Sequence, residues 1–397
     1  MLFHFSFKSS FLLIFFFHGL VFTFLLFRKG IVNNDKSAFW LSLFALLSSL
    51  YIAPFMLGYA GWYSNDPYRS ILFYIPFQQI LLMPPVLYIY CKTLFDKSFV
   101  FQKKDGVHFL PALLYLLYTL AIAITDKAVL GYAYFYEDGR DKDFSLWYQL
   151  AGFGSLLFYL VKSLKLYKQY RFFTFNTVSY ADALTFKWAQ RFLIFLLLLV
   201  IIRGAFFIIN PERAEFGRKF WYYAAFSVLF YAVTISGYVN AIRSITSFSD
   251  WSEMPESNQN EPDQSDSLAA KQERTDEKIQ LPGLDRWKQQ IETLMLSDKL
   301  YENPELSITD ISMKLNTHSK RISQVINQGF GMNFNDFINQ YRVEAVVDKI
   351  NEGGHLNQTL LSLAFESGFN SKSTFNRAFK RTMGMSPNEY LEKNFRK

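Results

Sequence analysis

The ten residues from Lys372 to Arg381 carry two kinds of side chain at helical spacing. Phe375 and Phe379 lie four positions apart, so they share one face of a helix and should pack into a protein core. The segment also holds four cations and no acid, and these are Lys372, Arg377, Lys380 and Arg381. Exposed lysine and arginine on a helix suit phosphate oxygens and guanine edges, which makes this face a candidate nucleic-acid surface.

The same pattern occurs once more, 53 residues earlier in the chain. Ile322 and Ile326 correspond to Phe375 and Phe379, and a Gly-Met pair follows both copies. Each copy therefore predicts a short helix, a tight turn and a second helix. The predicted helices are Ile308–Leu315 and Ser319–Gln328, then Leu360–Ser367 and Lys372–Arg381, with a long helix at Phe334–Glu352 between the copies.

The turns between the paired helices carry residues that tolerate a left-handed backbone. Gly368 occupies this place in the second copy and Asn316 in the first. Ser371 or Asn370 can cap the helix that follows the second turn. In such a helix-turn-helix, the first helix braces the second, and the second enters the major groove of DNA. The alternative is a set of ordinary amphipathic helices with solvated charges, and the repetition at a fixed offset argues against it.

Residues Leu284–Lys393 resemble the DNA-binding domain of the AraC/XylS family of bacterial transcription regulators. The stretch Ala364–Phe369 is similar to the family's alanine–glycine-phenylalanine core, and Gly384, Pro387 and Tyr390 keep its later spacing. The resemblance implies a soluble seven-helix domain. Its two helix-turn-helix units would insert into successive major-groove segments of double-stranded DNA.

The resemblance and the cationic face together assign candidate DNA contacts to the second helix of each copy. In the first copy these are Lys320, Arg321, Ser323 and Gln324, and in the second copy they are Lys372, Ser373, Asn376, Arg377, Lys380 and Arg381. We expect Arg377 to read a base edge and Lys380 to bind the phosphate backbone.

The segments before residue 243 have a composition unlike that of a soluble protein. The whole chain has 44 phenylalanines and only 19% charged residues, against about a quarter in soluble proteins. Seven apolar runs occur here, and most have the length that crosses a bilayer as a helix. They are Phe5–Phe27, Ala38–Ala60, Ile71–Leu94, Val107–Ile124, Leu146–Leu166, Trp188–Ile209 and Phe220–Ile242. The predicted fold class is therefore all-α, a transmembrane bundle of about seven spans followed by the soluble helical domain.

The distribution of charge predicts the orientation of this bundle. With the N-terminus outside, the inner segments carry fourteen lysines and arginines and the outer segments eight, in agreement with the positive-inside rule. The first run lacks a small-residue cleavage site and ends in Arg28-Lys29, so we expect a span rather than a signal peptide. An odd number of spans puts the C-terminus in the cytoplasm, and the predicted location is the bacterial cytoplasmic membrane, multi-pass.

The segment between the bundle and the soluble domain has a different composition again. Asp250–Ala270 holds six acidic residues and no basic one. Such a sequence cannot bury enough apolar surface to order itself, so we expect a flexible acidic linker. The predicted domains are residues 1–242 as a membrane bundle and sensor, 243–283 as the linker, and 284–397 as the DNA-binding domain.

No set of residues predicts catalysis or cofactor binding. The five histidines show no metal-ligand spacing, and the chain has no phosphate-binding glycine loop and no nucleophile elbow. The single cysteine, Cys91, excludes an internal disulfide. We therefore expect a protein that is not an enzyme and that needs no metal or cofactor.

Four residues of the predicted bundle are candidates for sensing a ligand. Tyr134, Tyr136 and Asp138 lie in the longest outer loop, Thr125–Phe144, and Arg203 lies inside the sixth run. An intramembrane arginine can pair with an acidic ligand, and the aromatic side chains of the loop can contact one. The alternatives are an aromatic belt at the membrane interface and an arginine that extends to that interface.

These patterns predict a membrane-anchored transcription regulator that couples a membrane or extracytoplasmic signal to gene expression. Its expected partners are double-stranded DNA and membrane lipid, and an unknown small ligand and a second copy of the chain are further candidates. One alternative is a transporter or intramembrane enzyme with a regulatory DNA-binding tail. Another is a bundle that only anchors the domain until proteolysis in the linker releases it.

Overall fold

The structure, a computed structural model, describes residues 3–96, 98–209, 219–239 and 283–395. Within these ranges the chain forms helices and turns and no strand, which confirms the predicted all-α fold class. The chain divides into two compact units. The N-terminal unit comprises Met1–Gln169 and Phe186–Phe248, and the C-terminal unit comprises Tyr170–Thr185 and Ser249–Lys397.

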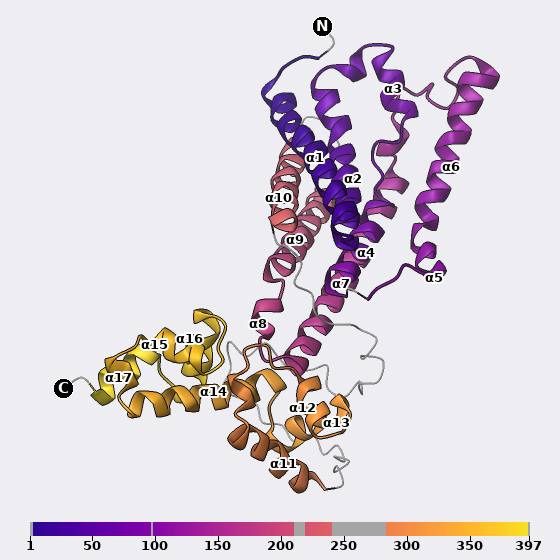
Figure 1. Ribbon diagram of the computed structural model, residues 1–397. Coiled ribbons are helices and arrows are strands. Elements are labelled where there is room, and N and C mark those ends of the chain that lie inside the picture. The colour runs from indigo at the N-terminus through magenta and orange to yellow at the C-terminus, as the bar shows by residue number, and fades with distance from the viewer. Residues whose placement is uncertain (1–2, 97, 210–218, 240–282, 396–397) are drawn as a thin grey trace. The chain divides into compact units, whose positions relative to one another are not determined.

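The N-terminal unit consists mainly of long helices (Figure 1). Its helices are α1 (Phe7–Val32), α2 (Lys36–Tyr59), α3 (Tyr68–Tyr74), α4 (Met83–Phe95), α5 (Lys103–Gly106), α6 (Leu110–Ile124), α7 (Leu146–Thr177), α9 (Lys187–Ile209) and α10 (Phe220–Val239). α7 continues past Gln169, so its last turns belong to the C-terminal unit. α1 packs along α2 and α10, and α10 also packs on α9.

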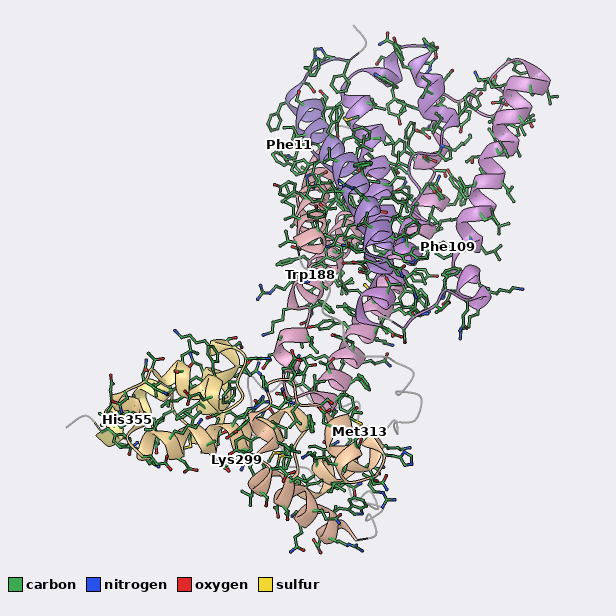
Figure 2. All side chains as sticks on the ribbon, viewed as in Figure 1. Phe11, Phe109, Trp188, Lys299, Met313 and His355 are labelled. Atoms are coloured by element: carbon green, nitrogen blue, oxygen red, sulfur yellow. The ribbon has the colours of Figure 1, made fainter. Side chains whose placement is uncertain are left out.

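Aromatic side chains join helices of this unit that are distant in the sequence. Phe11 of α1, labelled in Figure 2, meets Phe220 of α10 edge to face, with ring centroids 5.8 Å apart. Phe109, which precedes α6, stacks on Trp40 of α2 with centroids 6.0 Å apart. Such pairs contribute about 0.5–1.5 kcal/mol each beyond the area that they bury. The abundant phenylalanine of the sequence therefore has a packing role.

Five helical stretches among the described residues are long and apolar enough to cross a membrane. They are Phe7–Val32, Lys36–Tyr59, Lys103–Leu130, Leu146–Thr177 and Phe220–Val239. Each of them coincides with one of the seven predicted runs, and the predicted run Trp188–Ile209 coincides with α9. Part of their apolar surface faces outward, since Leu113, Leu117 and Leu120 of α6 are all more than half exposed.

The predicted run Ile71–Leu94 is not one helix, and this prediction was wrong. α3 and α4 lie on either side of Ile75–Leu82, which is not helical. Pro76 has no backbone N–H and restricts the residue before it, whereas Pro84 and Pro85 suit the first turn of a new helix. The prolines of this run therefore mark a break between two helices.

Polar side chains from elsewhere in the unit satisfy the backbone of this break. The Asp143 carboxylate accepts a hydrogen bond from the Gln78 N–H at 3.1 Å. The Tyr148 hydroxyl donates to the Gln78 carbonyl at 2.6 Å, and the Gln149 side chain donates to the Gln78 side-chain oxygen at 3.0 Å. Irregular backbone inside an apolar bundle is tolerated where protein groups satisfy it in this way.

The C-terminal unit is built from short helices around one long helix, α14 (Phe334–Asn351). The others are α8 (Ala181–Leu184), α11 (Leu284–Ser297), α12 (Ile308–Lys314), α13 (Ser319–Val325), α15 (Leu360–Glu366), α16 (Lys372–Met383) and α17 (Pro387–Phe395). The four short helices predicted from the repeat, and the long helix between them, are confirmed with small differences at their ends.

Two apolar cores support this unit, and α14 contributes to both. Phe334, Phe337 and Ile338 belong to the core that α11, α12 and α13 share. Val343 and Val346 belong to the core formed with α15 and α16. Each core supports one copy of the repeat, so one continuous helix joins the two copies.

The segment Tyr170–Thr185 belongs to the C-terminal unit although more than a hundred residues separate it from α12 in the sequence. Val178 forms an isolated antiparallel bridge with Ser307, and the Ser179 N–H donates to the Leu306 carbonyl at 3.0 Å. The sequence did not indicate this association. The predicted linker, residues 243–283, lies outside the described residues except for its last position.

Candidate nucleic-acid interface

The turn between α15 and α16 depends on Gly368. Its φ is +92°, so the predicted left-handed conformation is confirmed. A Cβ atom at this position would lie 2.2 Å from the Tyr301 carbonyl oxygen, so a side chain does not fit. After the turn, the Phe369 N–H donates to the Ala364 carbonyl at 3.0 Å, and the Phe369 ring is buried. In the first copy Asn316 takes the left-handed conformation with φ +46°.

Capping residues define both ends of α16. Of the two predicted N-caps, Ser371 is the one used, and its hydroxyl accepts a hydrogen bond from the Thr374 N–H at 3.2 Å. Gly384 ends the helix in the left-handed conformation. Phe375 and Phe379 are buried in the core, as predicted. These contacts fix the rotation of the helix, so the opposite face is presented to solvent.

All six predicted contact residues of α16 are exposed, namely Lys372, Ser373, Asn376, Arg377, Lys380 and Arg381. Two of the cations have acidic partners. Arg377 forms a bidentate pair with Asp182, and Arg381 meets Asp336 at 2.6 Å. The structure therefore brings the predicted residues onto one face, and it adds two acids that sequence reasoning missed.

The corresponding helix of the first copy, α13, offers a smaller exposed set. Lys320 and Arg321 are exposed, and the Arg321 guanidinium lies 5.6 Å from the centroid of the Trp287 ring. Gln324 is half-buried, and Ser323 is only 7% exposed. The two cations of α13 are therefore more accessible than the two neutral candidates.

Arg342 of α14 is a further residue that sequence reasoning missed. It is 1% exposed, and its guanidinium donates to the Tyr301 and Asn303 carbonyls, each at 2.7 Å. Burial lowers the pKa of Arg342 to about 9. The side chain ties the segment before α12 to the helix that joins the two copies. One signal in the sequence could have predicted its burial. Arg342 lies four residues from both Ile338 and Val346, which are core positions, so the three side chains share one face of the helix.

The three predicted sensing residues of the loop Thr125–Phe144 differ in their exposure. Tyr134 is exposed and, with Asp138, helps to line an open surface depression. Tyr136 is buried, its ring stacks on Phe73 with centroids 4.9 Å apart, and its hydroxyl donates to the Phe73 carbonyl. Arg203 belongs to α9, but its side chain lies outside the described residues. Tyr136 therefore has a packing role, whereas Tyr134 and Asp138 share a surface.

Two carboxyl groups of the same loop are buried. Asp141 accepts a hydrogen bond from the Tyr63 hydroxyl at 2.8 Å, and Asp143 accepts one from the Tyr115 hydroxyl at 2.6 Å. The Asp143 N–H also donates to the Asp141 carboxylate at 2.9 Å. Burial raises the pKa of both carboxyl groups, and the charge of Asp143 raises the pKa of Asp141 further. The sequence did not predict that these two carboxyl groups are buried together.

Comparison with known proteins bears on the C-terminal unit. Among the described residues, no group of three or more histidine, cysteine, aspartate or glutamate side chains could hold a metal ion. No curated protein and no solved structure matches the chain. Residues 311–393 match a protein family described as a helix-turn-helix domain, and this range includes α13, α14 and α16. The match supports a DNA-binding transcription regulator with an AraC-type helix-turn-helix domain at residues 311–393.

Proposed function

We propose that this protein is a sequence-specific transcription regulator anchored in the cytoplasmic membrane, with residues 284–397 as its DNA-binding domain. The observation that carries the DNA-binding proposal is α16, whose aromatic face is buried, whose ends are capped and whose polar, cationic face is exposed. A helix held in this way by its own domain can enter the major groove as a rigid body. α13 would enter the neighbouring groove segment with Lys320 and Arg321.

The surface of the N-terminal unit supports membrane anchoring. Five helical stretches have the length and composition of spans. Phe17 and Phe24 of α1, like Leu113 and Leu117 of α6, are more than half exposed. In water a continuous apolar surface would favour aggregation, whereas lipid solvates it. We therefore assign the apolar helices of residues 1–242 to the bilayer and the DNA-binding domain to the cytoplasm, where the target DNA is.

The size of the N-terminal unit supports a sensing role. One apolar helix is enough to hold a domain at a membrane. Two of the additional helices, α6 and α7, are joined by the outer loop. In this loop Tyr134 and Asp138 line an open depression, and we assign ligand contact to this surface. Pairing of two bundles would raise the local concentration of paired DNA-binding domains, which links the signal to DNA occupancy.

Selection from a random pool of duplexes tests the proposed DNA binding. Full-length protein in lipid nanodiscs is incubated with mixed-sequence duplexes of about 40 base pairs, a length that holds several helical turns. The Asp182→Asn variant, which lacks the acidic partner of Arg377, is treated in the same way. Bound duplexes are amplified and sequenced. We expect an enriched site with two half-sites about one helical turn apart on one face. If neither protein enriches any sequence while both are folded by circular dichroism, the proposed function is wrong.

A further inference from the structure

We propose that the loop Val178–Leu184 is an internal ligand of the DNA-binding domain and that it withholds Arg377 from DNA. This inference rests on the proposed function, since it assigns a competitor to the same recognition helix. The loop includes α8 and connects α7 to α9, so it lies in the predicted inner segment between the fifth and sixth runs. It is part of the C-terminal unit, together with both helix-turn-helix pairs.

The loop has an internal structure of its own. Val178, Tyr180, Ala181 and Leu184 are buried and form one apolar cluster. The Tyr170 hydroxyl donates to the Leu184 carbonyl at 2.8 Å, which closes the loop on the end of α7. A segment that is already folded loses less conformational entropy when it docks.

The backbone of the loop docks beside the start of the first helix-turn-helix. Val178 pairs with Ser307 in an antiparallel bridge, and the Ser179 N–H donates to the Leu306 carbonyl at 3.0 Å. Ser307 is also the N-cap of α12, where its hydroxyl accepts a hydrogen bond from the Asp310 N–H. The docking site is therefore a rigid part of the domain.

Ser179 covers a buried polar stripe on α14. Asn335, Asn339 and Arg342 follow one another at helical spacing, and all three are buried. The Asn335 side chain donates to the Ser179 carbonyl at 2.7 Å, and the Arg342 guanidinium donates to the Ser179 hydroxyl at 2.9 Å. The Asn339 side chain donates to the Asn335 side-chain oxygen at 3.0 Å. Polar groups are buried at low cost only where partners satisfy them, so the stripe is matched to the loop.

The acidic end of the loop reaches the second recognition helix. Both carboxylate oxygens of Asp182 accept hydrogen bonds from the Arg377 guanidinium, and the Nη1–Oδ1 distance is 2.5 Å. The Asp182 side chain is only 10% exposed, whereas that of Arg377 is 51% exposed. In this pair the Arg377 guanidinium donates two parallel hydrogen bonds, and this bidentate geometry is the one that an arginine offers to guanine O6 and N7. Arg377 cannot hold both partners, and the Asp182 carboxylate would also repel DNA phosphates.

The docked loop and the DNA-bound form of α16 therefore exclude each other. A change that weakens docking of the loop strengthens the apparent binding of DNA, because the docking equilibrium and the DNA-binding equilibrium are linked. The loop is joined directly to α7 and α9, which cover two of the predicted spans. A change in the bundle can thus alter the docked fraction without any force passing through the acidic linker.

Full-length variants in lipid nanodiscs test this inference on the duplex enriched from the random pool. Asp182→Asn should tighten binding about tenfold, because it removes the ion pair and keeps the size of the side chain. Asp348→Asn is the charge-matched control, since Asp348 is exposed on α14, and it should change affinity less than about twofold. In an Arg377→Ala background, Asp182→Asn should give a much smaller gain, because only the repulsion between the carboxylate and the DNA phosphates is then removed.

Hydrogen exchange provides a second readout that follows the loop itself. Exchange of the Ser179 amide, measured with and without the enriched duplex, should accelerate several-fold when DNA binds, because its bond to Leu306 opens. Unchanged protection would overturn the proposal. An equal gain from Asp182→Asn in the Arg377→Ala background would also overturn it, since that result reports bulk charge alone.

The outcomes separate this inference from the proposed function. If Arg377→Ala weakens binding while Asp182→Asn leaves it unchanged, the loop is not a competitor and the DNA-binding assignment stands. If wild-type protein and Asp182→Asn both enrich no duplex, the proposed function fails and this inference fails with it. If only Asp182→Asn enriches a duplex, the restraint by the loop is supported directly.

Discussion

Arg377 and Lys380 occupy neighbouring positions on the exposed face of α16, but we expect them to contact different parts of the duplex. Arg377→Ala should weaken binding to the enriched site by about 1–3 kcal/mol and relax base preference in one half-site. Lys380→Ala should weaken enriched and scrambled duplexes alike and make binding less dependent on salt. Titrations at several salt concentrations measure both effects. Equal losses on the two duplexes for Arg377→Ala would exclude base reading by that side chain.

Gly368 and Gly384 share a left-handed backbone and differ in their surroundings. An alanine in this conformation costs about 1–2 kcal/mol at either position. At Gly368 the added Cβ atom would also lie 2.2 Å from the Tyr301 carbonyl oxygen, whereas at Gly384 nothing lies within 4 Å. We therefore expect Gly368→Ala to lower the opening free energy of α16 by about 2–5 kcal/mol and Gly384→Ala by about 1–2 kcal/mol.

Hydrogen exchange of the α16 amides in the full-length chain measures both opening free energies. Gly384→Ala is the matched control, because it changes the same backbone conformation without a close contact. If the two variants lost the same free energy, the close approach to Tyr301 would have no part in the requirement for glycine.

Asp141 and Asp143 should make the stability of the N-terminal unit depend on pH. Burial raises the pKa of both carboxyl groups above the ordinary value of about 4. At a pH between the ordinary pKa and the raised pKa values, the two carboxyl groups are protonated in the folded chain and ionised in the unfolded chain. The contribution of this pair to stability is therefore greatest at acidic pH and falls as the pH rises toward neutrality. The thermal unfolding midpoint in nanodiscs should be lower at about pH 8 than at about pH 5.

Asp141→Asn should flatten this pH dependence and raise stability at about pH 8 by about 1–3 kcal/mol. The amide keeps an oxygen for the Asp143 N–H and gains a donor for the Tyr63 hydroxyl oxygen, so the local hydrogen bonds are preserved. Asp138→Asn is the control, because this carboxylate is exposed in the same loop. A wild-type midpoint that does not change with pH would disprove the role of the pair.

Single-residue predictions from the sequence succeeded where a local rule applied. Gly368 follows from turn geometry, and the burial of Phe375 and Phe379 follows from helical spacing. Asp182 could not be predicted, because its pairing with Arg377 joins positions 195 residues apart and no spacing reports such a contact.

At the scale of elements, the break Ile75–Leu82 should depend on Tyr148. The Tyr148 hydroxyl donates to the Gln78 carbonyl inside an apolar unit. Tyr148→Phe removes this donor, keeps the ring, and should lower the free energy of unfolding by about 1 kcal/mol. Tyr118→Phe is the matched control, because Tyr118 is exposed, and it should have a smaller effect. Thermal unfolding in nanodiscs compares the two variants, and equal midpoints would refute this role of Tyr148.

Hydropathy predicted where helices occur and failed to predict where one is interrupted. The mean hydropathy of Ile71–Leu94 is high enough for a span, but mean hydropathy carries no information about which backbone N–H groups form helical hydrogen bonds. The interruption is stabilised by Asp143 and Tyr148, which lie 65 and 70 residues from Gln78. The prolines were visible in the sequence, but the polar groups that make a full break tolerable were recognisable only once the fold placed them beside it.

At the scale of the whole molecule, the long apolar runs and the helical repeat predicted an all-α chain, and the structure confirms it. Composition did not predict that Tyr170–Thr185 belongs with the C-terminal unit, because that association depends on hydrogen bonds of Ser179 and on the charge of Asp182. The predicted topology places this loop and the DNA-binding domain on the same side of the membrane, as such docking requires.

Two chimaeras distinguish sensing by the bundle from simple anchoring. In the first, one unrelated span replaces residues 1–242 and therefore also removes Tyr170–Thr185. In the second, the same span is followed by Tyr170–Thr185 and then by the native linker. If the bundle senses the signal, both chimaeras lose signal-dependent expression of the genes beside the bound sites. Expression that still follows the signal in either chimaera would show that the spans only anchor the domain.

The same two chimaeras also separate the bundle from the loop. Without Tyr170–Thr185, Asp182 is absent and Arg377 is available at all times, so target sites should be occupied constitutively. With the loop restored, occupancy at equal protein level should fall, with apparent affinity weaker by about tenfold, since the docked and DNA-bound forms compete. Genome-wide mapping of bound sites at matched expression measures the difference. Equal occupancy by both chimaeras would mean that the loop docks without restraining the domain, and the signal would then have to act through pairing of the bundles.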